Sequence, residues 1–339
     1  MLSAINRIAF SVFGVNIAWY GIIITAAMIL SLVYVCIAGK RVGLTVDDGI
    51  ELFLWVVPLA VIFARIFYVA VRPEYFPVRT WDDFVDLIAI WEGGITIIGG
   101  IFGGILGGFF FYLLHKKKIS FGALVDLVIP TLLLSQALGR WGNFINQEAY
   151  GTLIAEGFPQ GLPFSVFIEN CYEPICPCPG AGWHYATFLY ESVWNIVGAI
   201  ACFVIWFFMY KKDNKVRVPG ILGFFYFMWY FLIRAMMEYL RIDAVPVTQI
   251  ICFILFPLAI VGGIVYTVLK VSYDKTVIDI SDNKVDYSKT YTKIYLFVQK
   301  VRLRNKRNKV GGFAEEKASF ALIPKEKITK SPDPSQGGN

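Results

Sequence analysis

Charged residues are scarce in this chain: Asp, Glu, Lys and Arg make up 17% of its 339 residues, against a hydrophobic fraction of 57%. That balance excludes a water-soluble globular domain of this length. The chain also has only 2 histidines, and it contains no phosphate-binding loop, zinc-protease motif or dinucleotide fingerprint. We therefore expect no metal, no cofactor and no nucleic-acid partner.

Long apolar runs make up a large part of the chain. A bilayer core of roughly 30 Å requires about 20 apolar residues per helix. Seven runs meet this need, of which the fourth is the shortest: about 17–38, 50–71, 95–114, 121–138, 187–210, 219–240 and 247–269. The first is too long for a signal peptide, and no small-residue cleavage site follows it. The predicted fold class is an all-α integral membrane protein, a bundle of seven transmembrane helices.

Basic residues predict the orientation of this bundle. Lys and Arg follow the first, third, fifth and seventh runs, as at Lys40, Arg41 and Lys118, whereas the intervening loops are rich in Asp and Glu. Cytoplasmic loops of membrane proteins carry an excess of Lys and Arg. We therefore expect the N-terminus outside and the C-terminus inside. The net charge of +6 suits contact with anionic membrane lipids.

Three parts are expected along the chain. A transmembrane body covers 1–270, and within it a segment rich in Pro and Gly, at about 141–186, forms a small outer head. A basic tail at 271–339 is largely disordered. Within the tail, Tyr291 to Lys309 mixes apolar and basic residues, which predicts either a helix lying on the membrane or a solvated tail attracted to lipid.

Glycine pairs recur every four residues in the third run, at Gly99/Gly100, Gly103/Gly104 and Gly107/Gly108. They place a groove without side chains along one helix face. Such a groove favours close packing of a neighbouring helix. A lipid chain lying in the groove is the alternative.

Several ionisable residues fall inside the predicted helices, where each costs about 2.5–3.5 kcal/mol on insertion scales. Arg140 lies at the outer end of the fourth helix, and Arg234, Glu238 and Arg241 share one face of the sixth. An ion-pair network with Glu238 between its two arginines is one explanation. Because arginines outnumber acids at this depth, the other is a cavity that binds phosphate oxygens through paired guanidinium donors.

Other polar residues in the predicted membrane region have competing explanations. Arg65 and Asp126 lie within the second and fourth helices, where ion pairing inside the bundle is expected. Asn143 and Asn146 are three residues apart at the mouth of the cavity. They either bind an ester carbonyl or glycerol hydroxyl, or cap the helix end.

The block from Gly139 to Gly151 closely resembles the signature of the prolipoprotein diacylglyceryl transferases. Other landmarks of that family recur in the same order: Trp19-Tyr20-Gly21, Ala64-Arg65-Ile66-Phe67-Tyr68, Trp91-Glu92-Gly93-Gly94, Thr187-Phe188-Leu189-Tyr190-Glu191, and finally Tyr230, Arg234, Glu238 and Arg241. The match covers about 1–270 and leaves the tail outside it.

The resemblance implies a multi-pass enzyme of the bacterial cell membrane, with its active site in the outer half of the bilayer and no cofactor. It would transfer the diacylglyceryl group of phosphatidylglycerol to the lipobox cysteine of a prolipoprotein signal peptide and release glycerol phosphate, the first step of lipoprotein maturation. The implied catalytic residues are Arg140, Arg234, Tyr20 and Glu148. The implied phosphatidylglycerol site consists of Arg140, Arg234, Asn143, Asn146, Gly151, Tyr230, Glu238 and Arg241. Negative charge develops on the leaving phosphate, and preorganised arginines stabilise it.

The chain departs from the family at the position of the favoured base. Family members usually carry His or Tyr before the first glycine pair of the third helix, where this chain has Ile98, which accepts no proton. His184 precedes the fifth helix and is either a base or a loop histidine. Alternatively, the arginines lower the pKa of the thiol, which is about 8.5 in a free cysteine, while Glu148 or Tyr20 relays the proton. The base therefore stays unassigned.

Three cysteines cluster in the predicted head, at Cys171, Cys176 and Cys178. Their spacing is not that of a zinc site. In an oxidising exterior we expect Cys171 to pair with Cys176 or Cys178, which leaves one thiol over.

Two other classes of function compete with the transferase. A paralogue that binds phosphatidylglycerol or lipoprotein without catalysis would explain Ile98. A transporter of anionic lipid would also need an arginine cavity, but transporters often show paired halves, and the sequence shows no such internal symmetry.

Overall fold

The computed structural model describes residues 7–12, 15–73, 76, 81–88, 94, 96–168, 181–211, 217–241, 246–281, 290 and 292–299. The chain forms two compact units, Met1–Tyr266 and Thr267–Asn339, and each is described by itself. Cys171, Cys176 and Cys178 lie outside the described residues. The disulfide between them stays a prediction.

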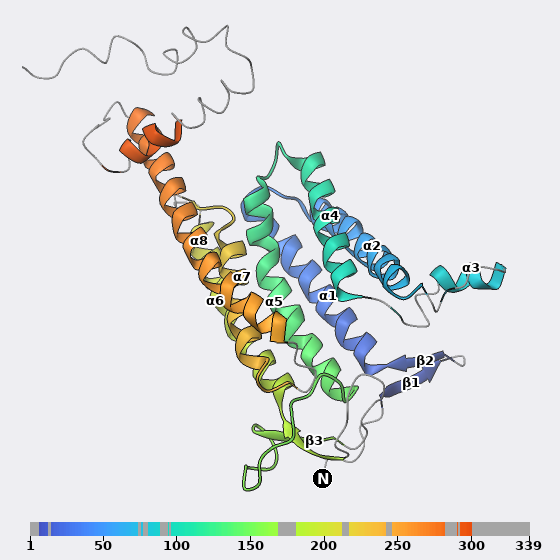
Figure 1. Cartoon of the computed structure of the whole chain (residues 1–339). Coiled ribbons are helices and arrows are strands. Elements are labelled where there is room, and N and C mark those ends of the chain that lie inside the picture. The colour runs from blue at the N-terminus through green and yellow to red at the C-terminus, as the bar shows by residue number, and fades with distance from the viewer. Residues whose placement is uncertain are drawn as a thin grey trace, which may run out of the picture. The chain divides into compact units, whose positions relative to one another are not determined.

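Helices dominate the first unit (Figure 1). Among the described residues, six helices are long and apolar enough to cross a membrane. They are α1 (Trp19–Ala38), α2 (Val46–Val71), α4 (Ile97–His115), α5 (Phe121–Ile145), α6 (Thr187–Met209) and α8 (Pro246–Ser281). The shorter α7 (Ile221–Met237) is also apolar. The predicted helical membrane bundle is confirmed, whereas the seventh crossing and the orientation stay predictions.

Small elements join these helices. Two pairs of antiparallel strands form: β1 (Ile8–Val12) with β2 (Val15–Ala18), and β3 (Ser165–Ile168) with β4 (Gly182–Tyr185). In the described part of the first unit, short helices form at η1 (Gly39–Val42) and α3 (Trp81–Ile88). The first strand pair leads directly into α1, and the second belongs to the predicted head segment.

Helix α5 is central in the first unit and packs against α1, α6 and α7 (Figure 1). Leu127 and Leu133 of α5, Cys202 of α6 and Leu222 of α7 are fully buried in the resulting core. Lipid tails are as apolar as these side chains, so association rests on close packing and on polar contacts between helices. The polar contacts that α5 makes with its neighbours therefore help to explain how the bundle holds together.

Helix α4 packs against α2 through the first glycine of each pair. A Cβ atom at Gly99, Gly103 or Gly107 would overlap the backbone of α2, where the nearest atoms are carbonyl oxygens. The second glycine of the last pair, Gly108, has open space around the Cβ position. The glycine repeat therefore serves helix packing, as the sequence favoured.

Asp126 caps a neighbouring helix from the interior of the bundle. Its side chain is fully buried and accepts hydrogen bonds from the backbone N–H of Gly220 (2.7 Å), the backbone N–H of Leu222 (2.9 Å) and the hydroxyl of Tyr210 (2.9 Å). The first N–H groups of a helix have no partner within the helix. The ion pair expected for Asp126 is thus replaced by a cap on the start of α7.

Replacing Asp126 with Asn should destabilise the protein. Hydrogen bonds to a charged acceptor contribute about 1.5–3 kcal/mol each, and the amide NH2 would face backbone donors, so we expect a loss of roughly 3 kcal/mol. Thermal unfolding in detergent should show a melting temperature lower by about 5 °C or more. The exposed Glu156→Gln is the matched control. Equal melting temperatures for the two variants would contradict the capping role.

Arg65 ties α2 to the last turn of α3 and to residues before and after that helix. Its side chain is buried, and it donates to the backbone carbonyls of Asp86 (2.5 Å), Leu87 (3.0 Å) and Gly94 (2.8 Å). The guanidinium also lies 5.2 Å from the ring centre of Phe76. Arg65 therefore has a structural role, in which backbone carbonyls accept its hydrogen bonds.

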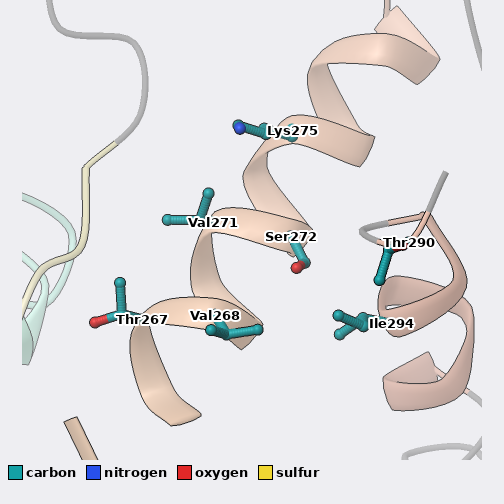
Figure 2. Close-up of a pocket in the computed structure, with 7 residues that line it drawn as sticks. All are labelled: Thr267, Val268, Val271, Ser272, Lys275, Thr290 and Ile294. Carbon is teal, nitrogen blue, oxygen red and sulfur yellow. The ribbon is translucent and has the colours of Figure 1, made fainter. Parts of the chain in front are cut away.

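The described part of the second unit comprises the end of α8 and a short helix at 292–299. A cavity of about 370 Å³ lies between them, and Val268 and Ile294 point toward one another across it (Figure 2). The rings of Tyr273 and Tyr295 are 5.4 Å apart. The short helix falls within Tyr291 to Lys309, the stretch for which the sequence predicts either a helix lying on the membrane or a solvated tail.

Candidate functional site

Five arginine and glutamate side chains meet where α5 ends, where α6 begins and around the end of α7. Arg140, five residues before the end of α5, forms an ion pair with Glu191 in the second turn of α6. The other carboxylate oxygen of Glu191 lies 3.5 Å from Nη1 of Arg241. Arg234 of α7 pairs with Glu238, the residue that directly follows the helix, at 3.3 Å. Glu191 thus joins an arginine from α5 to one that follows α7.

Both glutamates are almost inaccessible to solvent: 6% of the Glu191 side chain and 2% of the Glu238 side chain are exposed. About a fifth of the Arg140 and Arg234 side chains is exposed, at 21% and 19%. The carboxylates are therefore the buried part of the cluster, and the side chains of Arg140 and Arg234 are its more accessible part.

Tyr20 reaches the same place from the start of α1. Its ring packs against Gly142 of α5, where a Cβ atom would lie 2.5 Å from Cδ2 of the ring. The hydroxyl is close enough to Glu148 and Arg140 to interact with both electrostatically. Gly142 thus supplies the space that lets Tyr20 approach Arg140.

Helices α5 and α7 face each other through polar side chains at one-turn intervals. Gln136 donates to the hydroxyl of Tyr226 (2.8 Å), and Tyr226 stacks on Tyr230 with ring centres 6.0 Å apart. One turn further along each helix, Arg140 lies within electrostatic range of Tyr230 and Arg234. The sequence placed Tyr230 and Arg234 with Arg140, and the geometry brings all three together.

The turn after α5 positions Glu148. Gln147 and Ala149 adopt left-handed backbone conformations, with φ of 52° and 54°, which non-glycine residues seldom adopt. The Glu148 N–H donates to the carbonyl of Asn143 (3.0 Å), and the Asn146 amide donates to Oε1 of Glu148 (3.3 Å). The turn therefore holds one carboxylate oxygen of Glu148 while the residue stays exposed.

Gly151 connects the head to the end of α7. It forms a β-bridge with Arg241, and the next residue, Thr152, donates to the carbonyl of Leu240 (2.7 Å). A Cβ atom at Gly151 would lie 2.6 Å from Cβ of Tyr185 and 2.9 Å from the Leu240 carbonyl oxygen. Only glycine fits here, and the backbone it carries fixes the position of Arg241.

His184 is a structural residue of the head. Its side chain is fully buried, its Nδ1 lies 2.8 Å from the Gly151 carbonyl oxygen, and its ring packs edge-on against Tyr150. Burial lowers the pKa of His184, and the bond to Gly151 opposes that effect. These contacts, and the position of His184 in strand β4, favour a structural role over that of a catalytic base.

Ile98 lies in the first turn of α4, and 72% of its surface is exposed. Its helix packs against α2 through Gly99, and α2 supplies none of the arginine cluster described above. This chain therefore has no proton acceptor at the position where members of the family usually carry one.

Sequence reasoning missed the part that Glu191 plays. It appeared as a landmark in the fifth apolar run, but no role was assigned to it. The available signal was a carboxylate in the second turn of an apolar helix, where an unpaired charge is costly and a cationic partner is expected. The same face carries Ser192 and Asn195, both buried.

A cationic site at the ends of membrane-spanning helices is typical of membrane proteins that bind anionic lipid. Residues 7–279 match the family model described as prolipoprotein diacylglyceryl transferase. The chain belongs to this family, a family of transferases in lipoprotein biosynthesis, and the resemblance seen in the sequence is confirmed.

The chain is similar to three curated relatives, each named phosphatidylglycerol–prolipoprotein diacylglyceryl transferase. It is 35% identical over 275 residues to the protein of Enterococcus faecalis, which covers 78% of this chain and 92% of the relative. The Listeria innocua protein is 33% identical, covering 79% and 92%. The Bacillus cereus protein is 36% identical, covering 71% and 82%.

Proposed function

We propose that this chain transfers the diacylglyceryl group of phosphatidylglycerol to the thiol of the lipobox cysteine in a prolipoprotein. The products are a thioether-linked lipoprotein precursor and glycerol phosphate. The reaction takes place in the outer half of a bacterial cell membrane, at the arginine cluster. The proposal rests on family membership together with the geometry of that cluster.

The charge of the cluster carries the proposal. Three guanidinium groups, those of Arg140, Arg234 and Arg241, meet two buried carboxylates, those of Glu191 and Glu238. The ion pairs therefore leave one positive charge in excess among these five residues. A phosphodiester carries one negative charge, and the planar guanidinium binds two of its oxygens at once.

The same charges stabilise the leaving group. The thiolate sulfur attacks the glycerol carbon that carries the phosphate, a C–S bond forms, and the C–O bond breaks with its electron pair going to the phosphate oxygen. Negative charge thus grows on the phosphate as the reaction proceeds. Arg140 and Arg234 are already in place, so they stabilise that charge without reorganising. Glu191 and Glu238 act as positioning residues for them.

Glu148 is the proposed acceptor of the thiol proton. Ile98 accepts none, and His184 is enclosed in the head. Glu148 is exposed and interacts with Tyr20, and within the described part of the chain its side-chain hydrogen bond is the one that Oε1 accepts from Asn146. Tyr20 relays the proton between the thiol and Glu148. The excess positive charge of the cluster favours the thiolate.

Asn143, Tyr230 and Gly151 complete the proposed lipid site. The side chain of Asn143 has no hydrogen-bond partner among the described residues, which leaves its amide available to a hydroxyl or ester carbonyl of the lipid. Tyr230 lies beside Arg140. Gly151 shapes the rim by holding Arg241 in place.

An in vitro assay tests the function. Purified full-length protein, phosphatidylglycerol vesicles and a lipobox peptide are combined, and both glycerol phosphate and the lipidated peptide are measured. We expect the two products in equal amounts. A peptide with serine in place of the lipobox cysteine should give neither, and the Enterococcus faecalis relative serves as the positive control.

The main alternative is a paralogue that binds phosphatidylglycerol without turning it over, and the exposed Ile98 is the observation that favours it. In that case both products are absent, while the purified protein still retains phosphatidylglycerol and the control enzyme is active. That result would overturn the proposed activity and leave the lipid site standing.

A further inference from the structure

A second cluster of charged side chains lies far from the arginines, where α2 begins and α4 ends. Asp48 and Glu51 are on the first two turns of α2, and His115 is the last residue of α4. Nε2 of His115 lies 3.2 Å from Oδ1 of Asp48 and 3.5 Å from Oε2 of Glu51. These three ligand atoms all lie within 4.8 Å of one another.

Each of the three side chains is held by a separate partner through its other polar atom. The backbone N–H of Thr45 donates to Oδ2 of Asp48 (2.8 Å), and the indole of Trp55 donates to Oε1 of Glu51 (3.4 Å). Nδ1 of His115 lies 3.2 Å from the carbonyl oxygen of Phe111. Metal ligands in proteins are oriented in this way by groups outside the ligand set.

The histidine contact also fixes which ring nitrogen carries the proton. A carbonyl oxygen only accepts hydrogen bonds, so Nδ1 of His115 must donate to Phe111. The imidazole is further held by stacking on the Phe111 ring, with ring centres 4.3 Å apart. In the neutral ring Nε2 then presents a lone pair to two carboxylates. Three electron-pair donors that face one another repel unless a positive charge lies close to them, and a metal cation, the Lys118 ammonium or a proton on Nε2 can each supply it.

We propose that Asp48, Glu51 and His115 bind a divalent transition-metal cation, with Zn²⁺ as the best fit. One imidazole nitrogen and two carboxylate oxygens are ligands that Zn²⁺ accepts, and a water completes a tetrahedral set. An imidazole ligand disfavours Mg²⁺ and Ca²⁺, which prefer oxygen ligands. The cation joins α2 to α4.

The ammonium group of Lys118 occupies part of the space in which the metal would bind. Its Nζ lies 2.8 Å from Oδ1 and 3.1 Å from Oδ2 of Asp48, and about half of its side chain is exposed, at 49%. The flexible lysine can therefore move into solvent when a metal enters. Lys118 and Zn²⁺ compete for Asp48, which gives the test a variant expected to bind more tightly.

The cluster is distinct from the catalytic site. Arg140 lies 19 residues into α5 from its first residue, Phe121, so the rise along the helix amounts to about 28 Å. Phe121 follows His115 by six residues. The metal thus acts on the packing of α2 against α4 and leaves the reaction unchanged.

Calorimetric titration of metal-free, full-length protein with ZnCl2 tests the proposal, with metal analysis after dialysis to give the stoichiometry. We expect one site that His115→Gln and Glu51→Gln each weaken at least 10-fold. Lys118→Gln should strengthen it. Asp47→Asn, which removes the adjacent exposed carboxylate, is the matched control and should bind like the parent.

Transferase activity and thermal unfolding show whether each variant is folded, since none of these residues is in the catalytic site. If His115 is instead a protonated bridge between the two carboxylates, His115→Gln lowers the melting temperature equally with and without Zn²⁺, and Lys118→Gln leaves Zn²⁺ affinity unchanged. That outcome overturns the metal site. Zn²⁺ binding that persists unchanged in both weakening variants places the metal elsewhere and also overturns it.

Discussion

Replacing Arg140 with lysine should lower the turnover of the transferase by roughly 100-fold or more, while the protein still inserts and folds. Lysine keeps the charge but loses the planar fork that binds two phosphate oxygens together. Removal of one preorganised donor from a site where charge develops costs about 100- to 1,000-fold in rate. Arg140 also has to satisfy Glu191, and a single ammonium group cannot serve both partners from one position.

The expected loss is in turnover more than in lipid affinity, because the contact strengthens as charge grows on the phosphate. Initial rates at several phosphatidylglycerol concentrations separate the two effects. Arg41→Lys is the matched control: Arg41 lies 4.3 Å from the ring centre of Phe207, in a contact that an ammonium group can also make. Near-normal turnover in Arg140→Lys would remove Arg140 from the phosphate site.

Replacing Gly151 with alanine should abolish most of the activity although no charge is altered. The added methyl group would lie 2.6 Å from Cβ of Tyr185 and 2.9 Å from the Leu240 carbonyl oxygen, and a backbone contact of that kind cannot be relieved by turning a side chain. The strand-like bridge to Arg241 must therefore open. A displacement of about 1 Å at a positioned group costs on the order of 100-fold in rate.

The assay described above measures this effect, and limited proteolysis of the head reports whether it has detached. Gly108→Ala is the matched control, since the Cβ position at Gly108 meets open space and the residue lies on α4, away from the cluster. Full activity in Gly151→Ala would show that the head does not position Arg241.

The helices were predictable because apolar runs of membrane length leave few alternatives. Their ends were less predictable. The fourth run was expected over 121–138, but α5 continues to Ile145 through a polar block, since a helix satisfies its own backbone whatever its side chains are. The sixth run was expected to reach residue 240, yet α7 ends at Met237, just before the bridge between Arg241 and Gly151.

In the site, the arginines were predictable from their depth in the membrane, and their partners were not. Helical spacing on α7 placed Glu238 with Arg234, which the geometry confirms. Glu191 comes from another helix, and no spacing rule relates it to Arg140. Asp126 shows the same limit: burial of a carboxylate predicted a partner, but the donors are a tyrosine and two backbone N–H groups.

Arg241 takes part in two assemblies at once. Its backbone pairs with Gly151 of the head, and its guanidinium faces Glu191 across the cluster. Docking of the head and binding of an anion at the cluster therefore share one residue, and any free energy by which one affects the other acts equally in both directions. A phosphate-bearing lipid that binds Arg241 would thus act on the head as well as on the reaction, and that effect would end when glycerol phosphate departs.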